Sequence, residues 1–389
     1  MMRFSKTSIP ILLATTASAA VLPWNSTIPP PDANGKYTLR STGIVASFVP
    51  YGAAISNLFV ADKHNSTRDV VLGWENATFY TEDPWHDHYG SVPGRYGNRI
   101  ANASFTIDGV EYKVDANEHN GTNTLHGGSN GWDYRNWTVT ALTDSSITFS
   151  LFDADGEMGF PGDVLATSTY TLTPYTWHIT LTALSLTKKT PLLLTSHVYW
   201  NLDGFANPDS EKVYDHELHL PFSGMRIGVD DNLIPTGELL PNKNGSVTDF
   251  WSQPKAIGKH LNDTERGPDC GAGCSFYDNA FLVGPHDKEN QYVARLNSPW
   301  SGVEVKVFTD QAAFQIYSCA ASNGTKPIGK STQGLSGRPA VIQEGGCVVM
   351  EAEDWIDGIN NPEWGRKQIW GPEDGLLTFN ARYEFSTVY

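Results

Sequence analysis

Strict alternation of apolar and polar residues, in short runs cut by turn-forming residues, is the feature that most constrains the fold. The segments 177–182 (Trp-His-Ile-Thr-Leu-Thr) and 303–308 (Val-Glu-Val-Lys-Val-Phe) both alternate in this way. Such runs are typical of strands with one face buried against another sheet. No window has the period of a long amphipathic helix, and 36 Gly and 23 Pro interrupt the chain. The sequence therefore predicts an all-β chain, a large antiparallel β-sandwich.

The chain shows no internal repeat, low-complexity tract or interdomain linker. Its 389 residues are 40% hydrophobic, enough for a large core in one unit. The segment 207–273 is rich in Pro, Gly, Asn and Asp but contains a strand-like piece at 217–220. We interpret this segment as elaborated loops, and residues 21–389 as a single domain.

The first twenty residues are typical of a secretory signal. Arg3 and Lys6 give a positive start, residues 9–14 form a short apolar run, and residues 17–19 (Ala-Ser-Ala) suit a cleavage site. The apolar run is too short to span a bilayer, and no other stretch reaches the required length. We expect residues 1–20 to be removed and the protein to be secreted and soluble.

Asparagine sequons support export, because their density suits a secreted glycoprotein. N-glycans are expected on several of them, at positions that should lie on the surface. The Asn-x-Ser/Thr sequons begin at Asn25, Asn65, Asn76, Asn102, Asn120, Asn136, Asn244, Asn262 and Asn323.

The four cysteines suggest two disulfides in an oxidising compartment, with three possible connectivities. The close spacing of Cys270 and Cys274 favours a small looped bridge, which leaves Cys319 to pair with Cys347. A zinc site is the alternative, but no histidine lies at ligand spacing from the Cys-x3-Cys pair.

The formal charge of -16 and a pI near 5.0 argue against some partners. An acidic surface repels polyanions, so neither nucleic acid nor an anionic membrane is expected to bind.

A histidine in an apolar and aromatic run marks a candidate site at residues 195–204 (Thr-Ser-His-Val-Tyr-Trp-Asn-Leu-Asp-Gly). Alternation places Thr195, His197 and Tyr199 on one strand face, where polar groups could converge on a ligand. A lone histidine in a β-rich chain could equally be hydrogen-bonded in the core. Other segments favour a site: 94–100 (Gly-Arg-Tyr-Gly-Asn-Arg-Ile), 125–128 (Leu-His-Gly-Gly), 277–279 (Tyr-Asp-Asn), 314–317 (Phe-Gln-Ile-Tyr) and 347–351 (Cys-Val-Val-Met-Glu).

In this order the segments resemble the aldose 1-epimerase (galactose mutarotase) family, from residues 51–53 (Tyr-Gly-Ala) to 360–362 (Asn-Asn-Pro). The resemblance implies a single β-sandwich with a sugar site in a groove across one sheet. It implies an enzyme that interconverts the α and β anomers of free hexoses such as glucose or galactose, with no cofactor.

Interconverting anomers requires one acid and one base on opposite sides of the sugar. The ring oxygen receives a proton while the anomeric hydroxyl loses one, and reclosure reverses both steps. By resemblance His197 is the general acid and Glu351 the general base. Activity is then expected to fall at low pH, as Glu351 gains a proton, and at high pH, as His197 loses one.

The resemblance also assigns the residues that hold the sugar. His126 contacts and polarises the anomeric region, and Asn98 and Arg99 clamp the sugar hydroxyls, Arg99 through its planar fork of donors. Asp278 accepts hydrogen bonds from sugar hydroxyls. Tyr199 and Gln315 line the site, although a packing role suits these two residues equally well.

Two positions need separate interpretation. Many relatives follow the glutamate at position 351 with Thr-Gln, whereas this chain has Ala352 and Glu353. Repulsion between Glu351 and Glu353 could raise the pKa of one of them, and Glu353 is the reserve candidate for the base. Arg95 is interpreted as structural.

A metal at residues 86–88 (His-Asp-His) is the weaker interpretation, because the segment is loop-like and no third ligand is evident. No metal is predicted.

The rival functions are a phosphosugar epimerase, a secreted glycoside hydrolase built on Glu351 and Asp278, and a carbohydrate-binding protein without catalysis. An enzyme that binds a phosphosugar should have additional Lys or Arg residues around the phosphate. The matched segments contain few cationic residues besides Arg95 and Arg99.

Overall fold

A computed structural model describes residues 28–85, 87–260 and 276–389 of the chain. The predicted signal segment, the sequons at Asn25 and Asn262 and the predicted Cys270–Cys274 bridge lie outside the described residues. Within the described ranges, no helix has the length and apolar character needed to cross a bilayer.

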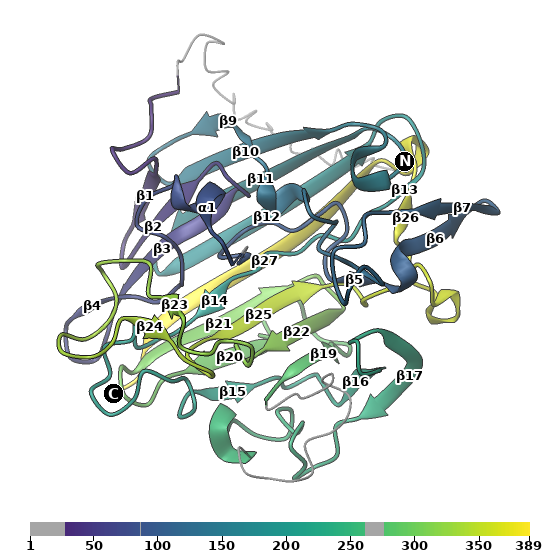
Figure 1. Cartoon of the computed structure of the whole chain (residues 1–389). Helices are drawn as coiled ribbons and strands as arrows, with labels where there is room; N and C mark the ends of the chain where they lie inside the picture. The colour runs from purple at the N-terminus through teal and green to yellow at the C-terminus, as the bar shows by residue number, and fades with distance from the viewer. Residues whose placement is uncertain (1–27, 86, 261–275) are drawn as a thin grey trace, which may run out of the picture.

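The largest layer among the described residues is a nine-stranded sheet whose neighbours all pair antiparallel (Figure 1). Its long strands run side by side across the back of the molecule. In spatial order they are β18 (Lys255–Ala256), β15 (Glu217–His219), β20 (Ala294–Asn297), β21 (Val303–Thr309), β27 (Leu376–Thr387), β12 (Thr176–Ser185), β11 (Val164–Thr173), β10 (Ser146–Asp153) and β9 (Thr138–Leu142).

Two further antiparallel sheets form the opposite layer. The first has four strands, β1 (Tyr37–Ser41), β2 (Ile44–Val49), β3 (Ala54–Ala61) and β4 (Thr67–Asp69). The second has six strands, in the order β14 (Tyr199–Trp200), β25 (Val348–Glu353), β22 (Ala313–Tyr317), β19 (Asp278–Leu282), β16 (Met225–Val229) and β17 (Pro235–Pro241).

Short elements connect these sheets. They are the helix α1 (Phe79–Glu82) and four strand pairs: β5 (Arg99–Ile100) with β8 (Thr124–Leu125), β6 (Ser104–Ile107) with β7 (Val110–Lys113), β13 (Thr190–Pro191) with β26 (Ile369–Trp370), and β23 (Lys326–Pro327) with β24 (Val341–Ile342).

One continuous core lies between the two layers and includes side chains from all three large sheets. Phe48 of β2 stacks on Tyr170 of β11 with ring centroids 4.6 Å apart, and Trp200 of β14 stacks on Tyr383 of β27 at 5.6 Å. Burying one such aromatic side chain contributes about 1.5–3 kcal/mol. In β12 every second residue, beginning with Trp177, is buried. The predicted antiparallel β-sandwich is therefore confirmed.

The segment 207–273 contributes more to the sheets than its composition predicts. It was interpreted as elaborated loops with a strand-like piece at 217–220, and β15 confirms that piece. In addition β18 extends the nine-stranded sheet, and β16 and β17 form an edge of the six-stranded sheet. These strands are short, and the pairing of β16 with β17 shifts register between Ile227 and Val229. The shift breaks the two-residue period by which strands are recognised.

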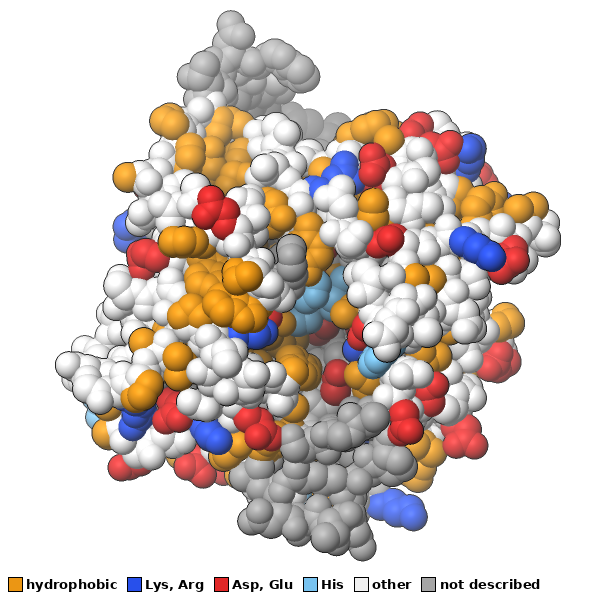
Figure 2. Space-filling view, in the orientation of Figure 1, with side chains coloured by type: hydrophobic (Ala, Val, Ile, Leu, Met, Phe, Trp, Pro, Cys, Tyr) orange, Lys and Arg blue, Asp and Glu red, His pale blue; other side chains and the backbone are white. Residues whose placement is uncertain are grey.

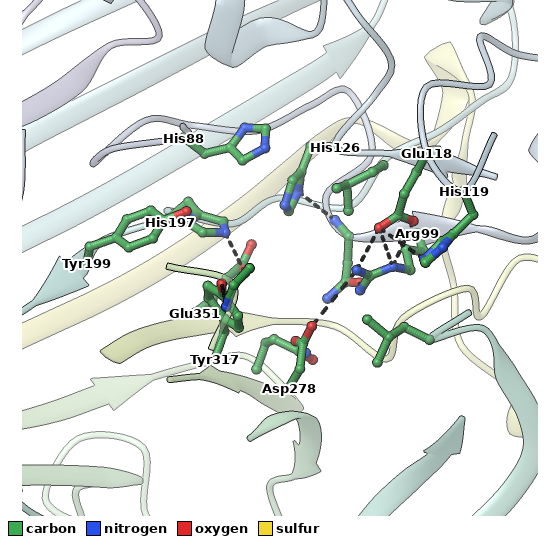
Figure 3. Close-up of a pocket in the computed structure, with 15 residues that line it drawn as sticks. His88, Arg99, Glu118, His119, His126, His197, Tyr199, Asp278, Tyr317 and Glu351 are labelled. Carbon is green, nitrogen blue, oxygen red and sulfur yellow. Dashed lines mark hydrogen bonds and ion pairs between the residues drawn. The ribbon is translucent and has the colours of Figure 1, made fainter. Parts of the chain in front are cut away.

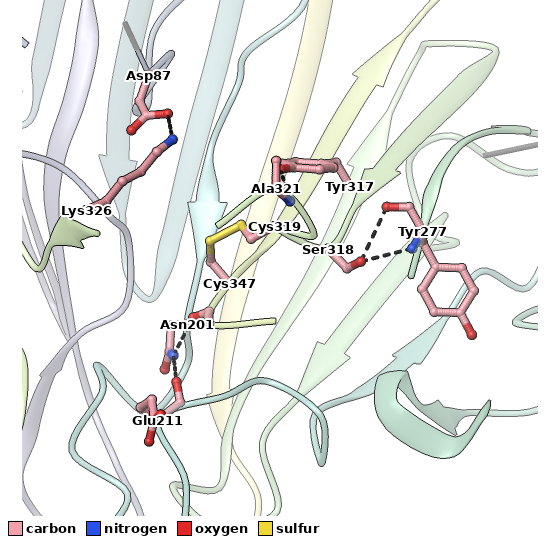
Figure 4. Close-up of a disulfide and its surroundings, with 11 residues drawn as sticks. Asp87, Asn201, Glu211, Tyr277, Tyr317, Ser318, Cys319, Ala321, Lys326 and Cys347 are labelled. Atoms are coloured by element: carbon pink, nitrogen blue, oxygen red, sulfur yellow. Dashed lines mark hydrogen bonds and ion pairs between the residues drawn. A yellow bond between two sulfur atoms is a disulfide. The ribbon is translucent and has the colours of Figure 1, made fainter. Parts of the chain in front are cut away.

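A disulfide joins Cys319 to Cys347, as predicted, with Cα atoms 5.5 Å apart (Figure 4). Cys319 follows β22, and Cys347 immediately precedes β25. The bridge therefore ties together the ends of two paired strands and closes the loop that contains β23 and β24. From this loop Lys326 forms an ion pair with Asp87 at 2.5 Å.

Candidate functional site

A cavity of about 350 Å³ opens at the six-stranded sheet, and all eight site residues predicted from the sequence line it. Figure 2 shows histidine side chains inside the central hollow of this face, and Figure 3 shows how the lining residues point toward one another. This volume is within the range of small-molecule sites. The eight residues are Asn98, Arg99, His126, His197, Tyr199, Asp278, Gln315 and Glu351.

Three neighbouring strands of the six-stranded sheet supply one wall of the cavity. Gln315 of β22 pairs directly with Glu351 of β25, so both side chains lie on the same sheet face. From β19, Asp278 accepts a hydrogen bond from the Gln315 amide at 2.5 Å. Because these side chains stand on paired strands, their spacing is fixed by the sheet.

The segment before β14 brings His197 and Tyr199 to the cavity. The His197 N–H donates to the Ser91 carbonyl at 2.9 Å, which holds the segment extended against residues 88–91. Alternation then sends Val198 and Trp200 into the core while His197 and Tyr199 line the cavity. The face predicted to carry the polar groups is the face that does so.

His126 is held in one orientation by its backbone and by its ring. Its φ is +52°, and its N–H donates to the Asn98 carbonyl at 2.9 Å. The Asn98 N–H donates in return to Nδ1 of His126 at 3.0 Å. The next residue must be glycine, since at Gly127 (φ +86°) a Cβ would lie 2.0 Å from the Gly94 carbonyl oxygen.

This arrangement fixes the protonation of His126. Because Nδ1 accepts a hydrogen bond, the neutral ring carries its proton on Nε2. Burial lowers the pKa of His126 well below its ordinary value, and the charges of His88 and His197 add to this effect. His126 can therefore donate a hydrogen bond to a ligand but cannot accept a proton readily.

Arg99 lies opposite this wall, oriented by Glu118. Its Nε and Nη2 atoms meet the two Glu118 oxygens at 2.9 and 2.8 Å, and its Nη2 lies 4.0 Å from Asp278. Burial lowers the pKa of Arg99, but the charges of Asp278 and Glu118 more than offset this effect. A fixed guanidinium beside a buried carboxylate can recognise adjacent hydroxyl groups.

His197 and Glu351 form the centre of the cavity. The His197 Nε2 lies 3.7 Å from the Glu351 Oε2, and both side chains are almost fully buried. Burial raises the pKa of Glu351 to about 8, and burial lowers the pKa of His197 well below its ordinary value. Near neutral pH these directions favour a protonated Glu351 beside a neutral His197.

This proton distribution is opposite to the starting state assumed from residue type, an ionised glutamate beside a protonated histidine. The physical reason is that burial disfavours the charged form of a titratable group. Burial therefore opposes the charge on Glu351 and the charge on His197 alike.

His126, His197 and Glu351 also bring ligand atoms within 4.8 Å of one another, close enough to surround a metal ion. The protonation of His126 argues against such a site. Its Nδ1 is occupied by the Asn98 N–H and its Nε2 carries the proton. A metal ion would have to displace either the Asn98 N–H from Nδ1 or the proton from Nε2, and it would lie next to the cationic Arg99.

Glu353, the reserve candidate for the base, lies on the same face of β25 but behind the cavity wall. Its Oε1 accepts a hydrogen bond from the Asn98 side-chain amide at 2.9 Å, and it does not line the cavity. Burial, followed by the charge of Glu351, raises the pKa of Glu353 well above its ordinary value. Glu353 is thus an uncharged carboxylic acid that supports Asn98.

The Glu353→Gln substitution should therefore leave kcat within about twofold of the wild-type value, because an amide can replace a protonated carboxyl group at nearly constant volume. Its oxygen can still accept from Asn98. Steady-state kinetics at neutral pH measure this, and a loss of kcat comparable to that of a Glu351 variant would show that Glu353 exchanges protons with the substrate.

Sequence reasoning missed several residues that line the cavity, among them His88, Glu118, His119 and Tyr317. Glu118 is nineteen positions from Arg99, and nothing in the local sequence links the two. The His-Asp-His segment did single out His88, but as a metal ligand. The structure instead places His88 beside His126 and His197.

Comparisons with known proteins agree with this fold. Residues 35–373 match the family model described as Aldose 1-epimerase. The "Probable aldose 1-epimerase" of Arthroderma benhamiae is 40% identical over 384 residues, covering 90% of this chain and 86% of that protein. The galactose mutarotase of Sus scrofa is 34% identical, covering 85% of this chain and 88% of that protein.

Among solved structures, an aldose epimerase homologue from C. elegans superposes with a TM-score of 0.78 at 27% identity. The match covers 92% of this chain and 100% of the homologue. The fold is that of a carbohydrate isomerase. The chain belongs to the aldose 1-epimerase family.

Proposed function

We propose that this protein is a mutarotase of free, unphosphorylated hexoses such as glucose or galactose. One observation carries the proposal: two buried titratable groups, His197 and Glu351 at 3.7 Å, face Arg99 and Asp278 inside one cavity. Such a cavity can both hold a polar ring and exchange protons with it.

The chemistry requires one proton donor and one proton acceptor beside the sugar. One partner takes the proton of the anomeric hydroxyl while the C1–O5 bond breaks and the ring oxygen receives a proton from the other. The aldehyde then rotates about the C1–C2 bond, and reclosure on its other face returns both protons. Following the family pattern, we assign His197 to the ring oxygen and Glu351 to the anomeric hydroxyl, once the bound sugar has moved the proton from Glu351 to His197.

The remaining residues would hold the sugar. Arg99 and Asn98 donate to hydroxyl oxygens and Asp278 accepts from hydroxyl groups, while the Nε2–H of His126 donates near the anomeric carbon. Gln315 contributes by fixing the Asp278 carboxylate. Tyr199 supplies an aromatic wall beside His197, with ring centroids 4.9 Å apart.

The rival functions fit these contacts less well. A phosphosugar would need free cations, but Arg99 is the one Lys or Arg lining the described cavity, and Glu118 already neutralises it. A glycoside hydrolase would need Glu351 and Asp278 as an acid and nucleophile pair, whereas Asp278 is engaged by Gln315 and lies near Arg99.

Optical rotation tests the proposed activity. Purified protein added to fresh α-glucose or α-galactose should accelerate the approach to the equilibrium rotation far above the spontaneous rate. A curve that follows the spontaneous rate with both sugars would contradict the proposal. Release of a new sugar from a glycoside would favour the hydrolase instead.

We further propose that the protein is exported and N-glycosylated. Six of the sequon asparagines, Asn65, Asn102, Asn120, Asn136, Asn244 and Asn323, are exposed, and Asn76 is half-buried. Protein from its native source should begin near Ala20 or Val21 and become smaller after endoglycosidase treatment. N-terminal sequencing that finds Met1 on unglycosylated protein would contradict export.

A further inference from the structure

His88 occupies the cavity although neither the sequence interpretation nor the proposed chemistry uses it. Its ring lies 4.5 Å from that of His126 and 5.3 Å from that of His197, measured between centroids. The rings of His126 and His197 are themselves 5.0 Å apart and perpendicular. The three histidines thus form one cluster, and in Figure 3 His88 lies on the side of His126 and His197 that is away from Glu351.

Asp133 fixes the His88 ring from behind. Nδ1 of His88 lies 2.5 Å from Oδ2 of Asp133, whose side chain is fully buried in the 3-10 turn Trp132–Tyr134. Nδ1 is therefore the protonated nitrogen that donates to the carboxylate. Nε2 is 3.5 Å from the Tyr134 hydroxyl, too long for a firm hydrogen bond, so Nε2 is available to a ligand in the cavity.

The charges around His88 favour its protonated form. Burial lowers the pKa of His88, but the hydrogen bond and charge of Asp133, with the charges of Asp87 and Glu351, raise it above its ordinary value. The other groups that face it are Tyr134, His126 and His197. The charge of His88 in turn lowers the pKa values of His126 and His197.

We propose that His88, held by Asp133, is a further catalytic residue of this site. Its Nε2–H contacts the sugar as a charged donor to the ring oxygen O5, on which negative charge develops while the C1–O5 bond breaks. No proton needs to leave His88. A donor that carries a fixed charge stabilises an oxyanion more than it stabilises the neutral oxygen of the ground state. The inference rests on the proposed mutarotase function.

Two substitutions separate this role from packing. His88→Gln keeps a donor of similar reach but removes the charge, and should lower kcat by about 10- to 100-fold, the usual value of a hydrogen bond from a charged group. Asp133→Asn keeps the acceptor for Nδ1 but removes the negative charge that retains the proton on His88. The exposed His64, whose ring meets the Trp300 carbonyl, provides the matched control His64→Gln, which should behave as the wild type.

The pH profile gives each variant a distinct signature. In Asp133→Asn, His88 loses its proton at lower pH, so the alkaline fall of kcat should move to lower pH. In His88→Gln, the charge that lowers the pKa of Glu351 is gone, so the alkaline fall should move to higher pH while kcat is reduced at every pH.

The experiment is the measurement of mutarotation kcat from pH 5 to 10, together with the melting temperature, for these three variants and the wild type. Opposite shifts in Asp133→Asn and His88→Gln support the proposal. Full kcat in His88→Gln, or equal losses in both variants with an unmoved pH profile, would overturn it. A wild type without mutarotase activity would instead overturn the proposed function.

Discussion

The Glu351→Gln substitution should lower kcat by about 10²- to 10⁴-fold, the usual contribution of a positioned acid or base. Gln matches the carboxyl group in size but cannot exchange a proton with His197, 3.7 Å away. KM should change less, because Arg99 and Asp278 remain in place to bind the hydroxyls. Steady-state polarimetry with glucose and galactose measures both constants.

The same substitution should stabilise the protein at alkaline pH. Burial raises the pKa of Glu351 from an ordinary 4.5 to about 8, so the native state holds a proton that the unfolded chain releases. Stability therefore falls as pH rises between these two values, and an amide removes this dependence. A Glu351→Gln variant with near-full activity, or one less stable than the wild type at pH 9, would contradict the assigned role. For the activity measurement, Glu353→Gln serves as the matched control.

The Arg95→Met substitution should cost about 3–5 kcal/mol in the free energy of unfolding, as for other buried ion pairs that lose one partner. Arg95 is fully buried, and its Nε donates to Asp153 at 2.8 Å. Its remaining donors meet the carbonyls of Ala154, Pro161 and Gly162 and the Thr190 hydroxyl. Met fills a similar volume and satisfies none of these acceptors.

Urea unfolding measures this loss, with Arg135→Met as the matched control. Arg135 donates to the same Asp153 at 2.6 Å, but its side chain is 20% exposed, so water can replace it and the cost should stay near 1 kcal/mol. Equal losses in the two variants would show that the charge on Asp153, rather than the satisfied carbonyls, dominates.

The fold was predictable where the two-residue period is unbroken. In β11 and β12 long alternating runs bury one face completely, and in β21 the valines 303, 305 and 307 all enter the core. The strands β16 to β18 were not predictable, because two to seven residues with a register shift carry too little periodicity.

Most of the site was predictable because local motifs carry it. Asn98 and His126 lie in Gly-containing segments with recognisable sequences, and Gln315 and Glu351 lie in regular strands, so the residues around each one identify it. Contacts between distant segments left no such signal. The ion pair of Arg99 with Glu118 and that of His88 with Asp133 each join residues whose proximity only the fold creates.

The Cys319–Cys347 bond has a consequence for how the protein is made. It clamps together the strands that carry Gln315 and Glu351, and the loop it closes reaches Asp87, next to His88, through Lys326. A host whose cytosol keeps thiols reduced would yield chains with an intact sandwich but a loosened wall around the histidines. Expression route would then govern the active fraction of a preparation, and circular dichroism alone would not reveal the difference.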